Sequence, residues 1–210
     1  RTGWVASARI PPPFGADTEA HEASPSSLRK SVSPATSSAS LSKASAVTFL
    51  GSSVISVAAW NRDGEIVFSS NAGQPFFRVV RMFRQRVTGG AAELINLGPA
   101  HHISFGPEGG TVIARAGSEP ARWKRYRGGR AGRFWIDRYD NGDYQALLDL
   151  PGNLAAPLWI GARIYFISDH EGIGNLYSCL TDGEDLQRHS DHAYFYARTP
   201  SSDGTRIVYH

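Results

Sequence analysis

The sequence predicts an all-β protein: an incomplete β-propeller of about three to four blades, each a four-stranded antiparallel sheet, behind a disordered head. Short runs rich in Val, Ile, Phe, Tyr and Trp are separated by turns that contain Gly, Asp and Asn, which is the pattern of short strands. These turns recur at roughly the length of a propeller blade, ~40–50 residues. Apolar residues at the helical spacing i, i+3, i+4 are sustained nowhere in the chain, so helices are not expected.

The predicted head is residues 1–46, where Ser, Pro and Ala dominate and no apolar periodicity is present. A segment of this composition cannot bury enough apolar surface to offset the entropy lost on folding. It also lacks the apolar core of a signal peptide. We therefore expect residues 1–46 to be a disordered Ser/Pro/Ala-rich segment, a linker or sequence foreign to the domain, and residues 47–210 to form the partial propeller.

Four units of strand, tight turn and strand follow one another after Val47. In chain order they are ISVAAW-NRDGE-IVFSS, HHISF-GPEGG-TVIAR, AAPLWI-GA-RIYFIS and FYART-PSSDG-TRIVYH. Their turn glycines, Gly64, Gly109, Gly161 and Gly204, lie 45, 52 and 43 residues apart. Asp-Gly and Gly-Gly pairs supply the positive φ that such hairpins need.

A second hairpin completes the first three units. It is found in QRVTGGAAELINL, in IDRYDNGDYQALLDL and in NLYSCLTDGEDLQRHS. Three full blades and part of a fourth therefore fit between Val47 and His210, and an incomplete ring leaves an unpaired strand edge and a half-covered core. The chain starts at Arg1 and stops inside the predicted strand RIVYH, so we expect a fragment of a longer protein.

Composition places the chain among ordinary soluble globular proteins. Hydrophobic residues make up 41% and charged residues 20%, with a net charge of +3, which is too small to indicate nucleic-acid binding by itself. The single cysteine, Cys179, excludes an internal disulfide and favours the cytoplasm. No window of about 18 apolar residues occurs, so we expect no membrane contact. No sequence pattern indicates a cofactor.

The most unusual segment is ARWKRYRGGRAGRFWID, Ala121 to Asp137, in which arginines and one lysine alternate with aromatic residues. Because it lies in the longest gap between turns, we expect an insertion between two strands of one blade, with FWID as the strand that resumes the sheet. Three interpretations stay open: binding of single-stranded nucleic acid, a positive channel lining that attracts carboxylates, or a solvated loop whose Arg stems cover apolar surface. The nucleic-acid interpretation would use Lys124, Arg125, Arg127, Arg130 and Arg133.

Other candidate sites have structural interpretations beside them. Six possible metal ligands occur in SDHEG and RHSDH: Asp169, His170, Glu171, His189, Asp191 and His192. Without an HExxH motif or a cysteine pair, we expect no metal; Asp169 should cap a hairpin turn and the histidines should lie at strand ends. No GxSxG motif is present, and Cys179 should be a buried small side chain, so we expect no catalytic residues in this chain. Four arginines in the stretch from Ser69 to Val87 indicate either a basic strand face or a solvated edge: Arg78, Arg81, Arg84 and Arg86.

Two motifs are specific enough to indicate a family: WKRYRGG, and SDHEGIGNLYS followed by RHSDH. They closely resemble the N-terminal six-bladed propeller of the tricorn protease family, and the resemblance covers roughly Val47 to His210. It implies a parent protein that is a large cytoplasmic serine protease, assembled as a hexamer, which shortens oligopeptides released by the proteasome. The catalytic serine and histidine of that family belong to later domains, and its propellers guide or filter peptides. Asp-Gly hairpins alone are shared with TolB-like and WD-repeat propellers, so an interaction propeller without protease activity is the alternative.

The resemblance also implies a carboxylate site. The family is associated with a pair of adjacent arginines that hold the C-terminal carboxylate of the substrate, and Phe77-Arg78 is the best match, in which only Arg78 fits. The geometry of a guanidinium suits a carboxylate. The candidate substrate-binding residues are Arg78, Arg122, Lys124, Arg125 and Arg127.

Overall fold

The computed structural model describes residues 6–9, 47–50, 54–116, 121 and 124–210, which form fifteen strands. The first sheet contains β2 (Val54–Trp60), β3 (Glu65–Ser70), β4 (Arg81–Arg86) and β5 (Glu93–Pro99). The second contains β6 (His102–Phe105), β7 (Thr111–Arg115), β8 (Arg133–Asp137) and β9 (Gln145–Ala146). The third contains β10 (Leu154–Ile160), β11 (Arg163–Ser168), β12 (Asn175–Leu180) and β13 (Gln187–Arg188). Within the described ranges, no helix has the length and apolarity needed to cross a membrane.

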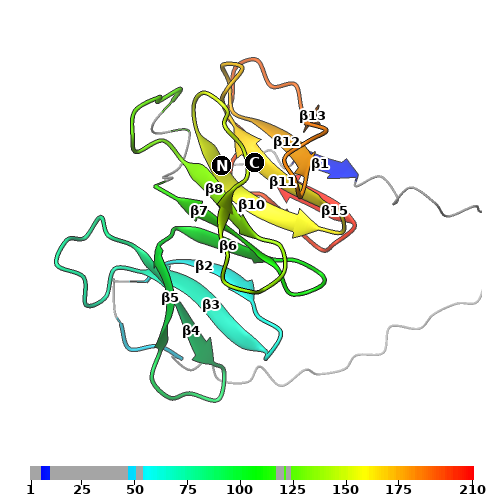
Figure 1. Ribbon diagram of the computed structural model, residues 1–210. Coiled ribbons are helices and arrows are strands. Elements are labelled where there is room, and N and C mark those ends of the chain that lie inside the picture. Colours follow the sequence, from blue (N-terminus) through cyan, green and yellow to red (C-terminus); the bar gives the residue numbers. More distant parts are fainter. Residues whose placement is uncertain (1–5, 10–46, 51–53, 117–120, 122–123) are drawn as a thin grey trace, which may run out of the picture.

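These three sheets confirm the predicted blades. In each one, four strands pair antiparallel in chain order, and the three sheets lie one after another (Figure 1). The glycines that predicted the repeat, Gly64, Gly109, Gly161 and Gly204, have φ values of 73°, 112°, 57° and 90°. Each φ lies in the left-handed region that favours glycine.

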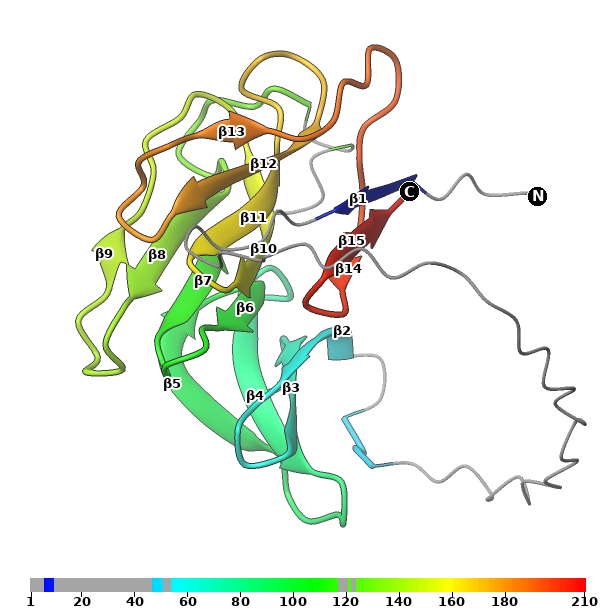
Figure 2. The same cartoon turned by 90° about the vertical axis from the view of Figure 1, so that its right-hand side faces the viewer.

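The fourth sheet is partial and uses the N-terminal segment. Its strand order is β1 (Ala6–Arg9), β15 (Arg206–Tyr209) and β14 (Ser201–Ser202), and both pairings are antiparallel. Figure 2 shows β1 beside β15, close to the C-terminus. Strand β1 was not expected, because it lies in the segment predicted to be disordered. The rest of residues 1–46 lies outside the described residues.

The predicted strand FYART, residues 195–199, is wrong. Phe195 is 80% exposed and Thr199 has a φ of 42°, while the strand itself, β14, lies two residues further on. Arg198 still exchanges two backbone hydrogen bonds with His210, but the Ala197 amide donates to the Gly174 carbonyl at 2.8 Å instead of continuing this ladder. Packing of Tyr196, which is 9% exposed, against Gly174 therefore overrides the strand preference of this segment.

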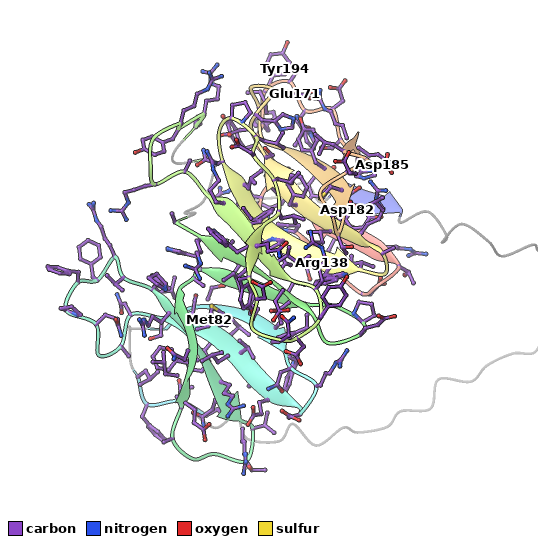
Figure 3. The ribbon with its side chains drawn as sticks, viewed as in Figure 1. Met82, Arg138, Glu171, Asp182, Asp185 and Tyr194 are labelled. Atoms are coloured by element: carbon purple, nitrogen blue, oxygen red, sulfur yellow. The ribbon has the colours of Figure 1, made fainter. Side chains whose placement is uncertain are left out.

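The core lies between consecutive sheets. Val67 and Met82 of the first sheet pack with Ile103 and Ile113 of the second, and Met82 is visible between the first two sheets in Figure 3. Between the second and third sheets, the rings of Phe134 and Phe166 pack edge to face, with their centroids 5.4 Å apart. The buried residues of the same cluster include Val112, Ile136, Leu154, Ile164, Tyr177 and Cys179. Between the third and fourth sheets, the buried cluster includes Tyr165, Ile167, Leu176, Ile207 and Tyr209. Stacking of sheets face to face is how propeller blades bury apolar surface.

One end of this stack is uncovered. Three large side chains of β2 are exposed, Ile55 by 50%, Val57 by 65% and Trp60 by 61%. Phe68 of β3, which pairs with Val57, is only 1% exposed, so this face is exposed along β2 and covered at β3. The uncovered face is the half-covered core predicted for an incomplete propeller.

Gly110 allows the close approach of the second and third sheets, and its replacement tests this packing. A Cβ at this position would lie 2.6 Å from the Arg138 carbonyl oxygen and 2.7 Å from the Trp159 ring. Since backbone cannot give way cheaply, Gly110→Ala should lower the free energy of unfolding by about 2 kcal/mol. Gly129→Ala is the matched control, because a Cβ there meets nothing within 4 Å, and it should change stability by less than about 0.5 kcal/mol. Urea unfolding measures both, and equal stability of the two variants would contradict the packing described.

Candidate functional site

The basic segment forms an insertion between two strands of the second sheet, as predicted. It connects β7 to β8, and FWID lies within β8. Four of its cations are exposed: Lys124, Arg125, Arg127 and Arg130. We call these four residues the basic surface. Arg122, a further candidate, lies outside the described residues.

Asp169 anchors the main chain of the insertion. Its carboxylate accepts hydrogen bonds from the Arg125 amide at 2.6 Å, the Asn153 amide at 2.7 Å and the Asn153 side chain at 3.0 Å. Asp169 is 1% exposed, so these bonds form away from water, where charge-assisted hydrogen bonds are strong. The expectation that its side chain caps its own hairpin is wrong, because the side chain joins two other segments. Arg125 is held with a φ of 53°, and its side chain is left free to face outward.

Two further contacts fix the insertion. The Lys124 ammonium lies 5.4 Å from the centroid of the Tyr196 ring, a cation–π contact, and the Tyr196 hydroxyl donates to the Gly172 carbonyl at 3.1 Å. Arg133 donates to the carbonyls of Gly132 and Gly152 at 2.9 and 2.8 Å. Arg133 is therefore tied to the main chain through one guanidinium nitrogen, unlike the four exposed cations.

The basic surface carries uncompensated positive charge. Across the described parts of the chain, none of its four side chains forms an ion pair. By contrast, two of the three arginines of β4 form ion pairs: Arg84 contacts Glu93 at 2.9 Å and Arg86 contacts Glu65 at 3.5 Å. Those two arginines form a solvated, paired edge, whereas the basic surface is open to an anionic ligand.

Arg78 lies on a different loop, the connection between β3 and β4, which leaves its sheet on the same side as the basic insertion. Because strands alternate in direction, the connections β3–β4 and β7–β8 lie at one end, and both project to the left in Figure 1. The Arg78 guanidinium lies 5.4 Å from the centroid of the Phe77 ring, and Phe76 and Phe77 are 70% and 74% exposed. Arg78 is exposed, but no described hydrogen bond or ion pair joins it to the basic surface.

Two exposed aromatic side chains, which we call the aromatic flank, lie in the segment that leads to Tyr196. Tyr194 is 87% exposed and Phe195 is 80% exposed, and they precede Tyr196, which contacts Lys124. Figure 3 shows Tyr194 at the edge of the molecule, near Glu171. Local sequence did not reveal this flank, because the aromatic run around Phe195 is typical of a strand. Aromatic rings beside unpaired cations suit an extended peptide, which presents both apolar side chains and a carboxylate.

The possible metal ligands are occupied by other interactions. Glu171 accepts from the Tyr177 hydroxyl at 2.8 Å and pairs with Arg188 at 3.2 Å, while Asp191 pairs with Arg188 at 2.7 Å. The His189 ring bonds the Ser178 hydroxyl at 2.7 Å. The described residues contain no group of three or more His, Cys, Asp or Glu side chains placed to hold a metal ion. Cys179 is fully buried, as predicted, and burial raises the pKa of its thiol to about 12.

Neutral histidines at the start of β6 should make the fold sensitive to acid. Burial lowers the pKa of His102 to about 4, and the neighbouring His101 contributes; burial and Arg130 also lower the pKa of His101. Below pH 6.5 the unfolded chain binds a proton at His102 that the folded chain does not, so stability is complete above pH 6.5 and falls as the pH approaches 4. We expect a loss of about 2 kcal/mol between pH 7 and 4.5 from His102. Urea unfolding at both pH values tests this, and an unchanged pH dependence in His102→Gln would contradict it.

The comparisons with known proteins point to one family. Residues 36–210 match the family model of the tricorn protease N-terminal beta propeller domain. The chain is 44% identical over 164 residues to tricorn protease homolog 1 of Streptomyces coelicolor, covering 78% of this chain and 15% of that protein. It is 38% identical over 153 residues to the tricorn protease of Thermoplasma acidophilum, covering 73% of this chain and 14% of that protein.

Solved structures agree. The crystal structure of the tricorn protease aligns with a TM-score of 0.67 at 37% identity, over 73% of this chain and 15% of that chain. A putative TolB from Agrobacterium tumefaciens aligns with a TM-score of 0.50 at 20% identity, over 66% of this chain and 46% of that chain, which is a likeness of fold alone. The chain therefore spans about 15% of the length of the tricorn relatives it matches.

Proposed function

From the premise that this chain belongs to the tricorn protease family, in its N-terminal β-propeller domain, we propose that it binds oligopeptides and guides them. The basic surface receives the C-terminal carboxylate of a peptide, and the aromatic flank contacts the apolar side chains that precede it. Peptide cleavage belongs, in this proposal, to catalytic parts of a tricorn-type protein outside this chain. The serine-protease activity, hexameric assembly and cytoplasmic location that the resemblance implies concern the whole protein and stay predictions.

The observation that carries this proposal is the unpaired charge of the basic surface on an anchored loop. Solvated cations on a mobile loop lose side-chain and backbone entropy when they bind a ligand, whereas Asp169 and Tyr196 already hold this loop in place, which lowers that cost. A guanidinium binds a carboxylate through two parallel hydrogen bonds. Arg125 and Arg127 supply two such groups close together in sequence.

The proposal is tested by titrating the chain with one fluorescent hexapeptide in two forms, a free C-terminal acid and the corresponding amide. The acid should bind at least about tenfold more tightly than the amide, which corresponds to ~1.4 kcal/mol. This preference should weaken as salt is raised, because exposed charges are screened. Equal binding of the two forms would contradict the proposed carboxylate site.

The same titration separates guiding from cleavage. After prolonged incubation, mass spectrometry should find the hexapeptide intact, because catalysis is assigned to residues outside this chain. Hydrolysis that a serine-directed reagent abolishes would contradict that assignment.

A further inference from the structure

The insertion between β7 and β8 carries more positive charge than the terminus of one peptide neutralises. By sequence, residues 117–133 contain six Lys or Arg residues and one acid, Glu119, which leaves five positive charges in excess. A C-terminal carboxylate brings a single negative charge, and its two oxygens are filled by one or two guanidinium groups. If Arg125 and Arg127 hold the terminus, Lys124 and Arg130 of the basic surface still lack an anion.

The acids of the neighbouring segment are engaged elsewhere. The buried carboxylate of Asp169 accepts three hydrogen bonds from amide groups. Glu171 and Asp191 both pair with Arg188, at 3.2 and 2.7 Å. In the ranges that the structure describes, no acid forms an ion pair with Lys124. An anion that neutralises Lys124 therefore has to come from the ligand.

Lys124 is the cation of the basic surface that contacts the segment of the aromatic flank. Its ammonium lies 5.4 Å from the centroid of the Tyr196 ring, and Tyr194 and Phe195 directly precede Tyr196. The Tyr196 ring is fixed, since it is 9% exposed and its hydroxyl donates to the Gly172 carbonyl. A cation–π contact occupies one side of an ammonium, so donors of the exposed Lys124 are left for a carboxylate.

The cations are carried on a folded loop. The Arg125 amide is bonded to Asp169, and the Ala131 amide donates to the Gly128 carbonyl at 2.9 Å. The Tyr126 ring packs directly against Gly128, where a Cβ would collide with it. Because the main chain turns back after Arg127, cations that are close in sequence can contact one ligand together.

We propose that the basic surface selects peptides with an aspartate or glutamate close to the C-terminus, and that Lys124 receives this side-chain carboxylate. The inference rests on the proposed function, in which Arg125 and Arg127 hold the terminal carboxylate, and it names the class of peptide that the site takes. A guanidinium fork suits the terminal carboxylate, whereas a compact ammonium with three donors accommodates a side-chain carboxylate in several orientations. The contact of Lys124 with Tyr196 places this charge beside the aromatic flank, where the residues before the terminus are proposed to bind.

Fluorescent hexapeptides that differ at a single position test this selection. Each carries Glu or its neutral isostere Gln at the second or third position from the C-terminus, and each is made as the free acid and as the amide. At one of these positions the parent chain should bind the Glu acid about threefold more tightly than the Gln acid, which is the size expected of an exposed ion pair. This ratio should fall toward unity as salt is raised from about 50 to about 300 mM.

The same peptides keep the two proposals apart. Equal affinity for Glu and Gln at both positions would overturn the selection of acidic peptides. The terminal carboxylate site is assessed separately, by the acid and amide forms of the Gln peptides, which differ only at the terminus. Unlabelled octathymidylate serves as a competitor, and it should displace the Glu peptide only at concentrations at least about tenfold above those of the unlabelled peptide. Displacement at lower concentrations would overturn the proposal in favour of a nucleic-acid interface.

Lys124→Gln assigns the selectivity to one side chain. In this variant the ratio of Glu to Gln affinity should fall to near one, and Lys124→Arg should restore it because the charge returns. Arg206→Gln is the matched control, since it removes one exposed positive charge on β15 and should keep the ratio near threefold. Urea unfolding verifies that the variants are folded. If Lys124→Gln keeps the ratio, or if Arg206→Gln loses it equally, Lys124 does not receive the acidic side chain.

Discussion

Replacing Asp169 by alanine should lower the free energy of unfolding by about 3–5 kcal/mol and release the basic insertion. The carboxylate is 1% exposed and accepts three hydrogen bonds from Arg125 and Asn153. Its removal takes this acceptor from three donors: the main-chain amide and the side chain of Asn153, which are buried, and the part-buried amide of Arg125. Each buried donor that loses its acceptor costs on the order of 1–3 kcal/mol. Urea unfolding measures the stability. Limited trypsin digestion reports the loop, because the exposed cations of the basic surface should be cleaved faster in the variant.

Asp182→Ala is the control for this substitution. Asp182 is an exposed acid in the turn between β12 and β13, where it accepts one hydrogen bond from the Glu184 amide at 2.9 Å. Its replacement should cost less than about 1 kcal/mol and leave the digestion of the insertion unchanged. Similar losses for Asp169→Ala and Asp182→Ala would show that Asp169 does not anchor the insertion.

Removing three of the four charges of the basic surface should weaken peptide binding far more than it affects stability. In the combined variant Lys124→Gln, Arg125→Gln, Arg127→Gln, the affinity for the hexapeptide acid should fall by about a hundredfold, or ~2.7 kcal/mol. Stability should fall by less than about 1 kcal/mol, because these side chains are exposed, the described contact that is lost is the one between Lys124 and the Tyr196 ring, and the amide of residue 125 can still donate to Asp169. Fluorescence anisotropy and urea unfolding measure the two quantities.

Arg86→Gln combined with Arg206→Gln is the control for charge, and it removes two positive charges where the test variant removes three. Both arginines are exposed and lie on other strands, β4 and β15. This variant should keep peptide affinity within about threefold of the parent, since only long-range attraction changes. If both charge variants lose the same affinity, net charge rather than the basic surface governs binding.

Local sequence was sufficient to predict the blades. The turn glycines require a positive φ, and that requirement is encoded in Asp-Gly and Gly-Gly pairs, so the repeat and the insertion between β7 and β8 could be found without a structure. The burial of Cys179 followed from the apolar strand around it. These features depend on residues that are close in sequence.

Features that depend on distant residues were missed. Asp169 bonds to Arg125, 44 residues away, and β1 pairs with β15 from the opposite end of the chain. The strand expected at Phe195 gave way to packing of Tyr196 near Gly174, where a Cβ would lie 2.5 Å from the tyrosine ring. Each of these contacts is specified by the fold as a whole, which local propensity does not contain.

The central claim, that the basic surface recognises the carboxylate of a peptide, is tested most directly by a double-mutant cycle. The affinities of the hexapeptide acid and amide are measured for the parent chain and for the variant Lys124→Gln, Arg125→Gln, Arg127→Gln. If the surface and the carboxylate contact each other, the preference for the acid should fall from about tenfold to near unity, a coupling of ~1.4 kcal/mol. If the variant keeps the full preference for the acid, the carboxylate binds elsewhere and the claim is contradicted.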